Sequence, residues 1–219
     1  MKADHALKAD VLAELAWDPM VDADHIGVTV RDGLVTLTGH TESYWQKRAA
    51  ETAVGRVKGV KAIAEAITVS LPLHVSRSDE EIARAAANRL DWDSAVPTGL
   101  VHVLVENGNV TLSGSVAQAY QREAAVLAVQ PLWGVLSVTN EITVSGPPTK
   151  PANPDQIADD IRRALNRGWF AADTVHVAAR GGIVTLSGSA STYRDRALAV
   201  ATAWAAPGTT VVENHIRIS

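Results

Sequence analysis

The chain has 219 residues, of which 47% are hydrophobic and 20% are charged, and its formal net charge is −4. This composition is typical of a folded soluble protein, and the charge lacks the basic excess expected of a nucleic-acid-binding protein. The chain contains no cysteine, which excludes disulfides, thiolate nucleophiles and cysteine-ligated metal sites.

The N-terminal stretch Met1–Asp10 is charged throughout and has no apolar segment, so we expect no secretory signal. No stretch reaches the roughly 18 apolar residues that would indicate a membrane span. As the sequence stands, these features predict a cytoplasmic protein, or a periplasmic one if a signal has been removed.

One short stretch occurs three times in the chain, as Gly33–Gly39, Gly108–Gly114 and Gly182–Gly188. Each copy begins at a turn glycine, alternates valine and leucine with threonine or serine, and stops at a second glycine. This alternation predicts a half-buried strand bounded by turns. We therefore expect structural turn roles for the six bounding glycines, which are Gly33, Gly39, Gly108, Gly114, Gly182 and Gly188.

The repeat extends to a period of about 75 residues, because the three closing glycines and the final strands keep the same register. This period is too long for a solenoid repeat and suits a small domain. The sequence therefore predicts three tandem domains, at residues 1–70, 77–145 and 153–219. Domains of this size bury modest cores, so packing between copies should contribute to stability.

In the first copy, a stripe of apolar residues predicts an amphipathic helix over residues 5–16, which Pro19 ends. A strand at 26–30 and a hairpin turn at 31–33 lead into the repeated strand, so these two strands should be antiparallel neighbours. An alanine-lined helix follows, and the strand over 60–69 should return parallel through a right-handed crossover. Each copy thus reads α-β-β-α-β.

The other copies follow the same plan. Ser78–Glu81 forms a capping box before the first helix of the second copy, and Asn153 with Pro154 predicts a capped helix start in the third. The expected fold class is α+β, with three repeats that each pack a small three-stranded mixed sheet against two helices. The short connectors at 70–77 and 145–153 predict a compact or gently curved row.

The repeated residues resemble the BON domain family. The resemblance rests on the turn glycine, the Val-Thr-Leu-Ser/Thr-Gly strand, the alanine-rich helix, a Gly-Val pair and a final strand of the form Val-x-Asn-x-Ile-x-Val. It is clearest in the second copy, through Gly134-Val135 and Val138–Val144, and the third keeps Asn214. The first copy departs from the pattern with Glu65 at the asparagine position.

The resemblance implies a non-enzymatic protein that is associated with osmotic or other stress and interacts with phospholipid surfaces, usually in the cell envelope. Some members of the family bind small ligands, including potassium. The resemblance therefore predicts a stress-associated binding protein for anionic phospholipid. A cytosolic small-ligand or potassium-ion sensor and a protein-interaction adaptor are the alternatives. No cofactor is expected.

Charge is distributed unevenly among the copies. Residues 1–70 carry eight basic and ten acidic side chains, residues 71–146 four and eight, and residues 147–219 eight and six, which gives −2, −4 and +2. The positive third copy also places arginines beside aromatics, a combination that suits an anionic membrane surface. The predicted lipid-facing residues are Arg162, Arg163, Arg167, Trp169 and Phe170. Alternatively, Trp169 fills the core and the arginines only solvate the helix.

The remaining polar and aromatic residues favour structural roles. Trp17 and Trp92 stand at equivalent helix ends and are expected to cap the cores of their own copies. His102 and His176 are predicted to be surface histidines, since no metal-binding spacing surrounds them.

Asn140 and Asn214 fall on the inward parity of their strands, which predicts buried amides that pin a neighbouring turn or bulge. The sequence contains no nucleophile elbow, P-loop or dinucleotide fingerprint, so catalysis is not expected.

Overall fold

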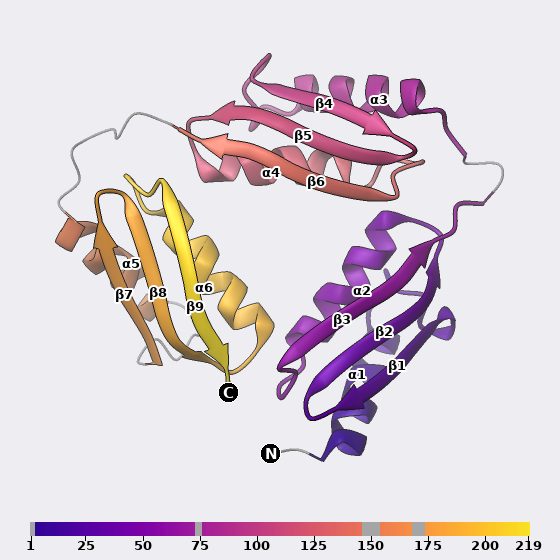
Figure 1. The fold of residues 1–219 in the computed structure, drawn as a ribbon, viewed down its shortest axis with the longest axis horizontal. Helices are drawn as coiled ribbons and strands as arrows, with labels where there is room; N and C mark the ends of the chain where they lie inside the picture. Colours follow the sequence, from indigo (N-terminus) through magenta and orange to yellow (C-terminus); the bar gives the residue numbers. More distant parts are fainter. Residues whose placement is uncertain (1–2, 73–75, 146–153, 168–173) are drawn as a thin grey trace.

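The structure is a computed structural model that describes residues 3–72, 76–145, 154–167 and 174–219. Within these ranges, every helix is too short or too polar to cross a membrane. Three repeats of α-β-β-α-β follow one another along the chain, as the sequence predicts (Figure 1).

The elements of the three repeats have matching lengths. The first repeat comprises α1 (Asp4–Trp17), a 3-10 turn η1 (Ala23–His25), β1 (Ile26–Arg31), β2 (Leu34–Thr41), α2 (Tyr44–Arg56) and β3 (Ala62–Val69). The second comprises α3 (Asp79–Trp92), β4 (Val101–Glu106), β5 (Asn109–Val116), α4 (Ala119–Val129) and β6 (Ser137–Val144). The third comprises α5 (Pro154–Arg167), β7 (Val175–Arg180), β8 (Ile183–Ala190), α6 (Tyr193–Ala205) and β9 (Val211–Ile218).

The repeated glycine-bounded stretch forms the middle strand of each sheet. The strand orders are β1-β2-β3, β4-β5-β6 and β7-β8-β9. The first two strands of each sheet pair antiparallel through a hairpin, and the third pairs parallel after the second helix. The predicted α+β class and the predicted topology of the mixed sheets are therefore confirmed.

Each repeat has its own apolar core between one face of its sheet and its two helices (Figure 1). In the first repeat, the α1 stripe of Leu7, Val11 and Leu15 is fully buried, and so are Ala50 and Ala53 of α2. Alanine in the second helix leaves room for the helix to lie close to the sheet, because it adds little side-chain volume. The predicted alanine-lined face is confirmed.

The closing glycine of each middle strand lies where no side chain fits. A Cβ atom would stand 2.0 Å from the His25 carbonyl oxygen at Gly39, 2.1 Å from that of Leu100 at Gly114, and 2.0 Å from that of Thr174 at Gly188. All three have positive φ angles, of 118°, 128° and 111°. These glycines let the residue before the first strand approach the middle strand closely.

An aspartate at the start of the first helix holds the hairpin turn in two of the repeats. The Asp4 carboxylate accepts hydrogen bonds from the N–H groups of Asp32 and Gly33, at 2.7 and 3.2 Å. Asp79 accepts equivalent bonds from Asn107 and Gly108, at 2.7 and 2.9 Å. Asp32 and Asn107 have positive φ angles of 53° and 52°, which residues other than glycine adopt only at a cost in energy. The carboxylate therefore stabilises an otherwise unfavourable turn conformation.

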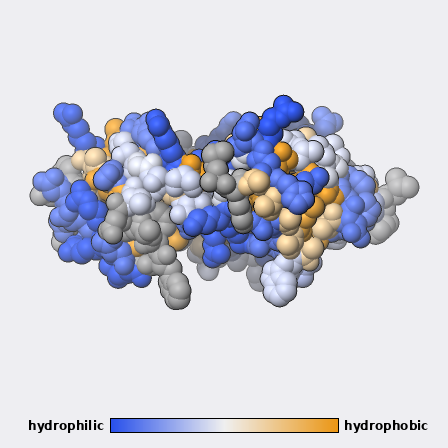
Figure 2. All heavy atoms as spheres, turned by 90° about the horizontal axis from the view of Figure 1, so that it is seen from below, coloured by the Kyte–Doolittle hydropathy of each residue, from blue (hydrophilic) through white to orange (hydrophobic). Residues whose placement is uncertain are grey.

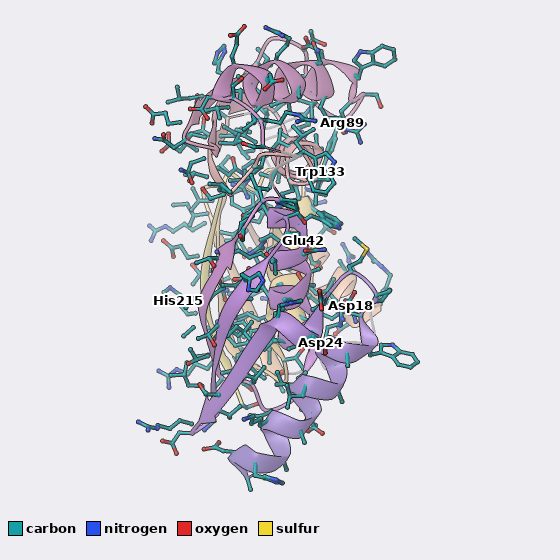
Figure 3. The ribbon with its side chains drawn as sticks, turned by 90° about the vertical axis from the view of Figure 1, so that its right-hand side faces the viewer. Asp18, Asp24, Glu42, Arg89, Trp133 and His215 are labelled. Carbon is teal, nitrogen blue, oxygen red and sulfur yellow. The ribbon has the colours of Figure 1, made fainter. Side chains whose placement is uncertain are left out.

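The three repeats lie around a common centre and form a flattened body (Figure 1). The sheets face one side of this body, which we call the sheet side, and the helices face the other, the helix side (Figures 1 and 3). The second helices α2, α4 and α6 lie toward the centre, and the first helices α1, α3 and α5 lie farther out.

The first and third repeats touch although they are far apart in the sequence. Tyr193, at the start of α6, packs against the core of the first repeat, and its hydroxyl donates a hydrogen bond of 2.6 Å to the Lys61 carbonyl oxygen. The Arg196 guanidinium lies 4.2 Å from the centre of the Tyr193 ring. The connectors predict a compact or gently curved row, and in the structure the chain closes on itself.

The other two contacts between repeats run in the same sense. Tyr44 of the first repeat packs against the core of the second, and the Arg122 guanidinium of the second lies 4.4 Å from the Trp204 ring of the third. Tyr44 and Tyr193 both follow their closing glycines by five residues. Each second helix thus contacts the next repeat, and the arrangement approximates a threefold ring.

Replacement of Gly188 by alanine should destabilise the third repeat by several kcal/mol, because the added Cβ would overlap a backbone carbonyl in an unfavourable φ region. Gly181→Ala is the matched control in the same repeat, since it also has a positive φ but meets nothing within 4 Å. This control should cost only about 1 to 2 kcal/mol. Hydrogen exchange read on peptides of the third repeat would measure both, and equal costs would contradict the close-approach explanation.

Replacement of Tyr193 should open the ring between the first and third repeats. Tyr193→Phe removes one hydrogen bond and should weaken closure by about 1 kcal/mol, whereas Tyr193→Ala also removes the packed ring. Small-angle X-ray scattering should show a larger radius of gyration for the alanine variant. Tyr120→Ala, at a residue that is 62% exposed, is the control and should leave the scattering curve unchanged. An unchanged radius for Tyr193→Ala would disprove the closing role.

Candidate functional site

The arginines predicted to face lipid lie on α5 and are all exposed. Arg162 pairs with Asp159 at 2.6 Å and donates a hydrogen bond of 2.9 Å to the Val177 carbonyl oxygen of β7. Arg162 thus links its helix to the neighbouring strand and has a structural task. Arg163 pairs with Asp160 one turn earlier in the helix.

These ion pairs reduce the positive field of α5. The helix contains three arginines and three aspartates, so its formal charge is zero. Arg167 stands exposed in the last turn, where a cation also interacts favourably with the helix dipole. The other two predicted lipid-facing residues, Trp169 and Phe170, lie outside the described residues.

Trp17 and Trp92 do not cap the cores of their repeats. Their side chains are 82% and 88% exposed, so the core-capping prediction is wrong. The physical reason is the phase of the helix. Each tryptophan follows the last buried leucine of its stripe, Leu15 or Leu90, by two residues, which is about 200° around an α-helix and therefore on the opposite side.

The other described tryptophans lie on or just after the second helices. Trp45 and Trp204 are half-buried, and Trp204 carries the Arg122 guanidinium on its ring. Trp133, after α4, is 52% exposed and lies on the helix side together with Asp18 and Arg89 (Figure 3). Aromatic side chains are thus displayed on the helix side at several points.

The histidines form no metal centre in the described residues. His102 and His176 are exposed, as predicted, and the part of the chain that the structure describes contains no group of three metal-binding side chains. His25 and His40 lie with ring centres 4.8 Å apart, and His25 Nδ1 is 2.9 Å from the Asp22 carboxylate. His215 lies on the sheet side (Figure 3).

Asn140 and Asn214 act as hydrogen-bond acceptors within their own strands. Each side-chain oxygen accepts a hydrogen bond of 3.0 Å from the N–H group two residues later, at Ile142 or Ile216. Glu65 accepts the equivalent bond from Ile67 in the first repeat. The predicted hydrogen-bonding role holds, but the bonds stay within the strand and do not pin a neighbouring turn or bulge, and the amides are exposed, so the prediction of burial is wrong.

These three side chains protect sheet edges. β3, β6 and β9 are edge strands, and they border the centre of the ring (Figure 1). An edge N–H that already bonds to a side chain cannot donate to another strand. The Glu65 carboxylate also pairs with Lys47 of α2 at 2.8 Å, which ties the edge to the helix above it.

The turn glycines Gly33, Gly108 and Gly182 lie in the hairpins between the first and middle strands. Gly33, Gly108 and Gly182 have φ angles of 82°, 75° and 85°. A Cβ at Gly108 would lie 2.8 Å from the Gly134 carbonyl oxygen, and one at Gly182 would lie 2.8 Å from the Thr210 hydroxyl. These glycines therefore allow the backbone conformation and the close packing that each hairpin turn requires.

An ion-pair network joins the C-terminal ends of α1 and α2. Arg56 donates to the carboxylates of Glu14, at 2.6 Å, and Asp18, at 2.8 Å. The hydrogen bond from Arg56 lowers the pKa of Asp18 and outweighs the opposing effect of burial, and the N–H group of Met20 lowers this pKa further. The charge of Asp18, next to the exposed Trp17, is thus offset by a fixed cation.

Comparison with known proteins supports the resemblance seen in the repeats. The family model described as BON domain matches residues 3–70, 78–146 and 153–219. Osmotically-inducible protein Y of Escherichia coli (strain K12) is 32% identical to this chain over 149 residues, which cover 64% of this chain and 71% of that protein.

Two solved structures show more distant likeness. CdsD, a structural protein of the Type III secretion system of Chlamydia trachomatis, is 17% identical with a TM-score of 0.27, over 98% of this chain and 92% of that one. The PrgH periplasmic domain is 14% identical with a TM-score of 0.22, over 89% of this chain and 95% of that one.

The Arg56 network should make the first repeat sensitive to acid. The folded state lowers the pKa of Asp18, so the resulting stability is present above the unfolded pKa of about 3.9 and is lost as pH falls through the folded value. Arg56→Met should cost about 1 to 2 kcal/mol at pH 7, and this cost should shrink near pH 2.

Arg48→Met is the matched control for this network, because Arg48 pairs with Glu51 on the same helix at a more exposed position. It should cost about 0.5 kcal/mol or less. Hydrogen exchange on first-repeat peptides at several pH values would measure both variants. A pH-independent cost for Arg56→Met would show that the network does not act through ionised Asp18.

Proposed function

The chain belongs to the BON domain family, and from that premise we propose that it is a non-enzymatic, stress-associated protein that attaches to anionic phospholipid surfaces. The printed name of its relative, osmotically-inducible protein Y, supports the association with stress. The observation that carries the lipid proposal is the combination of a third repeat with a charge of +2 and exposed arginines on its first helix.

The geometry divides the arginines of α5 into two groups. Arg162 bonds to the β7 backbone and is needed for structure. Arg163 is 67% exposed, and its pairing with Asp160 is a surface ion pair that water screens, so its guanidinium can exchange that partner for a phosphate. Arg167 in the last turn is exposed as well. Arg163 and Arg167 are therefore the groups that would meet a lipid phosphate.

A role without catalysis fits the use of the repeated polar residues. Asp4 and Asp79 hold hairpins, and Glu65, Asn140 and Asn214 hold strand edges. The residues that recur in corresponding places thus serve the fold. A surface that works through charge and exposed side chains can differ between the copies, as their net charges do.

Flotation with phospholipid vesicles tests the proposal directly. The protein should float with vesicles that contain phosphatidylglycerol, much less with pure phosphatidylcholine, and less again at moderate salt because the attraction is screened. Arg163→Gln and Arg167→Gln should each weaken attachment about fivefold, as expected for one basic residue near an anionic surface. Arg84→Gln, an exposed arginine of α3 that also pairs along its helix, is the matched control.

Absence of flotation under every condition would refute the proposal. The salt series should use potassium and sodium chloride at equal ionic strength. Equal loss of attachment in both salts supports a surface interaction, whereas a response to potassium alone would favour the ion-sensor alternative and overturn attachment by charge.

A further inference from the structure

The first strand of the second repeat, β4, covers its core less completely than the first strands of the other repeats do. Val101 and Val103 are half-buried, although their side chains lie on the inner face of the sheet and pack against the core. The corresponding residues of β1 and β7 are at most 6% exposed, and they are Ile26, Val28, Val175 and Val177. The second repeat therefore has an open apolar margin beside β4.

The backbone of β4 is open at the same place. In the third repeat, Arg162 donates a hydrogen bond to the Val177 carbonyl oxygen, which shows that this carbonyl points away from β8. Val103 takes the corresponding place in β4. Ala87 of α3 corresponds to Arg162, since each follows the first buried isoleucine of its helix by five residues. Alanine has no group that could bond to the Val103 carbonyl, so this edge offers an outward backbone acceptor.

The outer face of β4 adds an exposed apolar side chain. Leu104 is 56% exposed, and Leu100, just before the strand, is 48% exposed. The residues that correspond to Leu104 are Thr29 in β1 and Ala178 in β7. Within its sheet, β4 is the strand farthest from the centre of the ring (Figure 1), so another chain can reach it.

Apolar side chains do not form a continuous belt around the molecule. Figure 2 shows the edge opposite the second repeat, where apolar atoms emerge in separate areas between polar ones. The other edge of the second sheet is β6, whose Ile142 N–H already bonds to the Asn140 side chain. The open edge of β4 is therefore a local feature.

The charges around β4 favour a cationic partner. The strand ends at Glu106, whereas β1 and β7 end at Arg31 and Arg180. The strands of the second sheet contain the acidic residues Glu106 and Glu141 and no lysine or arginine. In α3, four acidic side chains outnumber two arginines, and the net charge of residues 71–146 is −4. Opposite charge on a partner would speed its association and select it over anionic partners.

We propose that the β4 edge binds an extended, basic peptide segment of another protein, which adds to the second sheet as a fourth strand. The outward backbone groups of β4 supply the hydrogen bonds, as in other complexes formed by strand addition. Alternate side chains of the peptide cover Val101 and Val103 on one face and lie beside Leu104 and Glu106 on the other. This site uses a different repeat and the opposite charge from the attachment to phospholipid proposed above, so each proposal can fail without the other.

An alternating Lys-Val peptide of about eight residues, labelled with fluorescein, is the probe. Its fluorescence anisotropy should rise with the concentration of the full chain, and an alternating Glu-Val peptide should bind at least about tenfold more weakly. Two further Lys-Val peptides carry N-methyl groups on all valines or on all lysines. Because alternate N–H groups of a strand point to opposite edges, one of these peptides should lose binding and the other should keep it. Equal binding by both would overturn strand addition.

Variants of the protein test the location of the site. Glu106→Arg copies the strand end of β1 and β7 and should weaken binding of the Lys-Val peptide about tenfold. Glu141→Arg makes the same change of charge on β6 and is the matched control, with a loss of about twofold or less because its effect is screened. Ala87→Arg places a donor where Arg162 stands in the third repeat, and it should weaken binding by occupying the Val103 carbonyl. The unfolding midpoint of each variant should match that of the unmodified protein.

Absence of binding by the Lys-Val peptide up to about 1 mM would refute the proposal. Equal losses for Glu106→Arg and Glu141→Arg would indicate a diffuse attraction to the acidic repeat and overturn the β4 site. Light scattering checks a second copy of the chain as the occupant of this edge. A monomeric mass supports the proposal, whereas a dimer that Ala87→Arg dissociates would assign the edge to self-association and overturn it.

Discussion

The close approach of backbone to backbone at the closing glycine is the constraint on which each repeat depends. The residue before the first strand approaches the middle strand so closely that no Cβ fits, at Gly39, Gly114 and Gly188 alike. This contact lies at the first residue pair of each antiparallel ladder, so it fixes the first strand beside the middle strand. The second helix can lie close on the sheet because its inner face is alanine, and each core then consists of about a dozen buried aliphatic side chains.

The repeats contact one another through their second helices and not through their sheet edges. The sheet edges at the centre are occupied by their own acidic and amide side chains, so the repeats do not join their sheets. Contact passes through the second helices instead, by a tyrosine on a neighbouring core or an arginine on a tryptophan ring. The sheets therefore lie on one side of the molecule and the helices on the other.

Most of the fold could be predicted from the sequence because the same residue pattern occurs three times in the chain. Periodicity defined the helices, and glycine-bounded alternation defined the middle strands. Trp17 and Trp92 were misassigned although helix phase alone places them about 200° from the buried stripe. The Asp4 and Asp79 clamps were missed, since one acidic residue at a helix start has several uses. Closure through Tyr193 could not be predicted, because it depends on the relative orientation of repeats joined by short connectors.

For the candidate site, the sequence indicated exposed arginines on α5 but not the hydrogen bond between Arg162 and the β7 backbone.

The closed ring also explains why three copies form a self-limiting unit. Each repeat offers one half of a head-to-tail contact through the start of its second helix and the complementary half elsewhere. A chain of two such repeats would leave one half of this contact unsatisfied on each repeat. In the three-repeat chain, the last repeat meets the first, so every half of this contact is satisfied within one molecule.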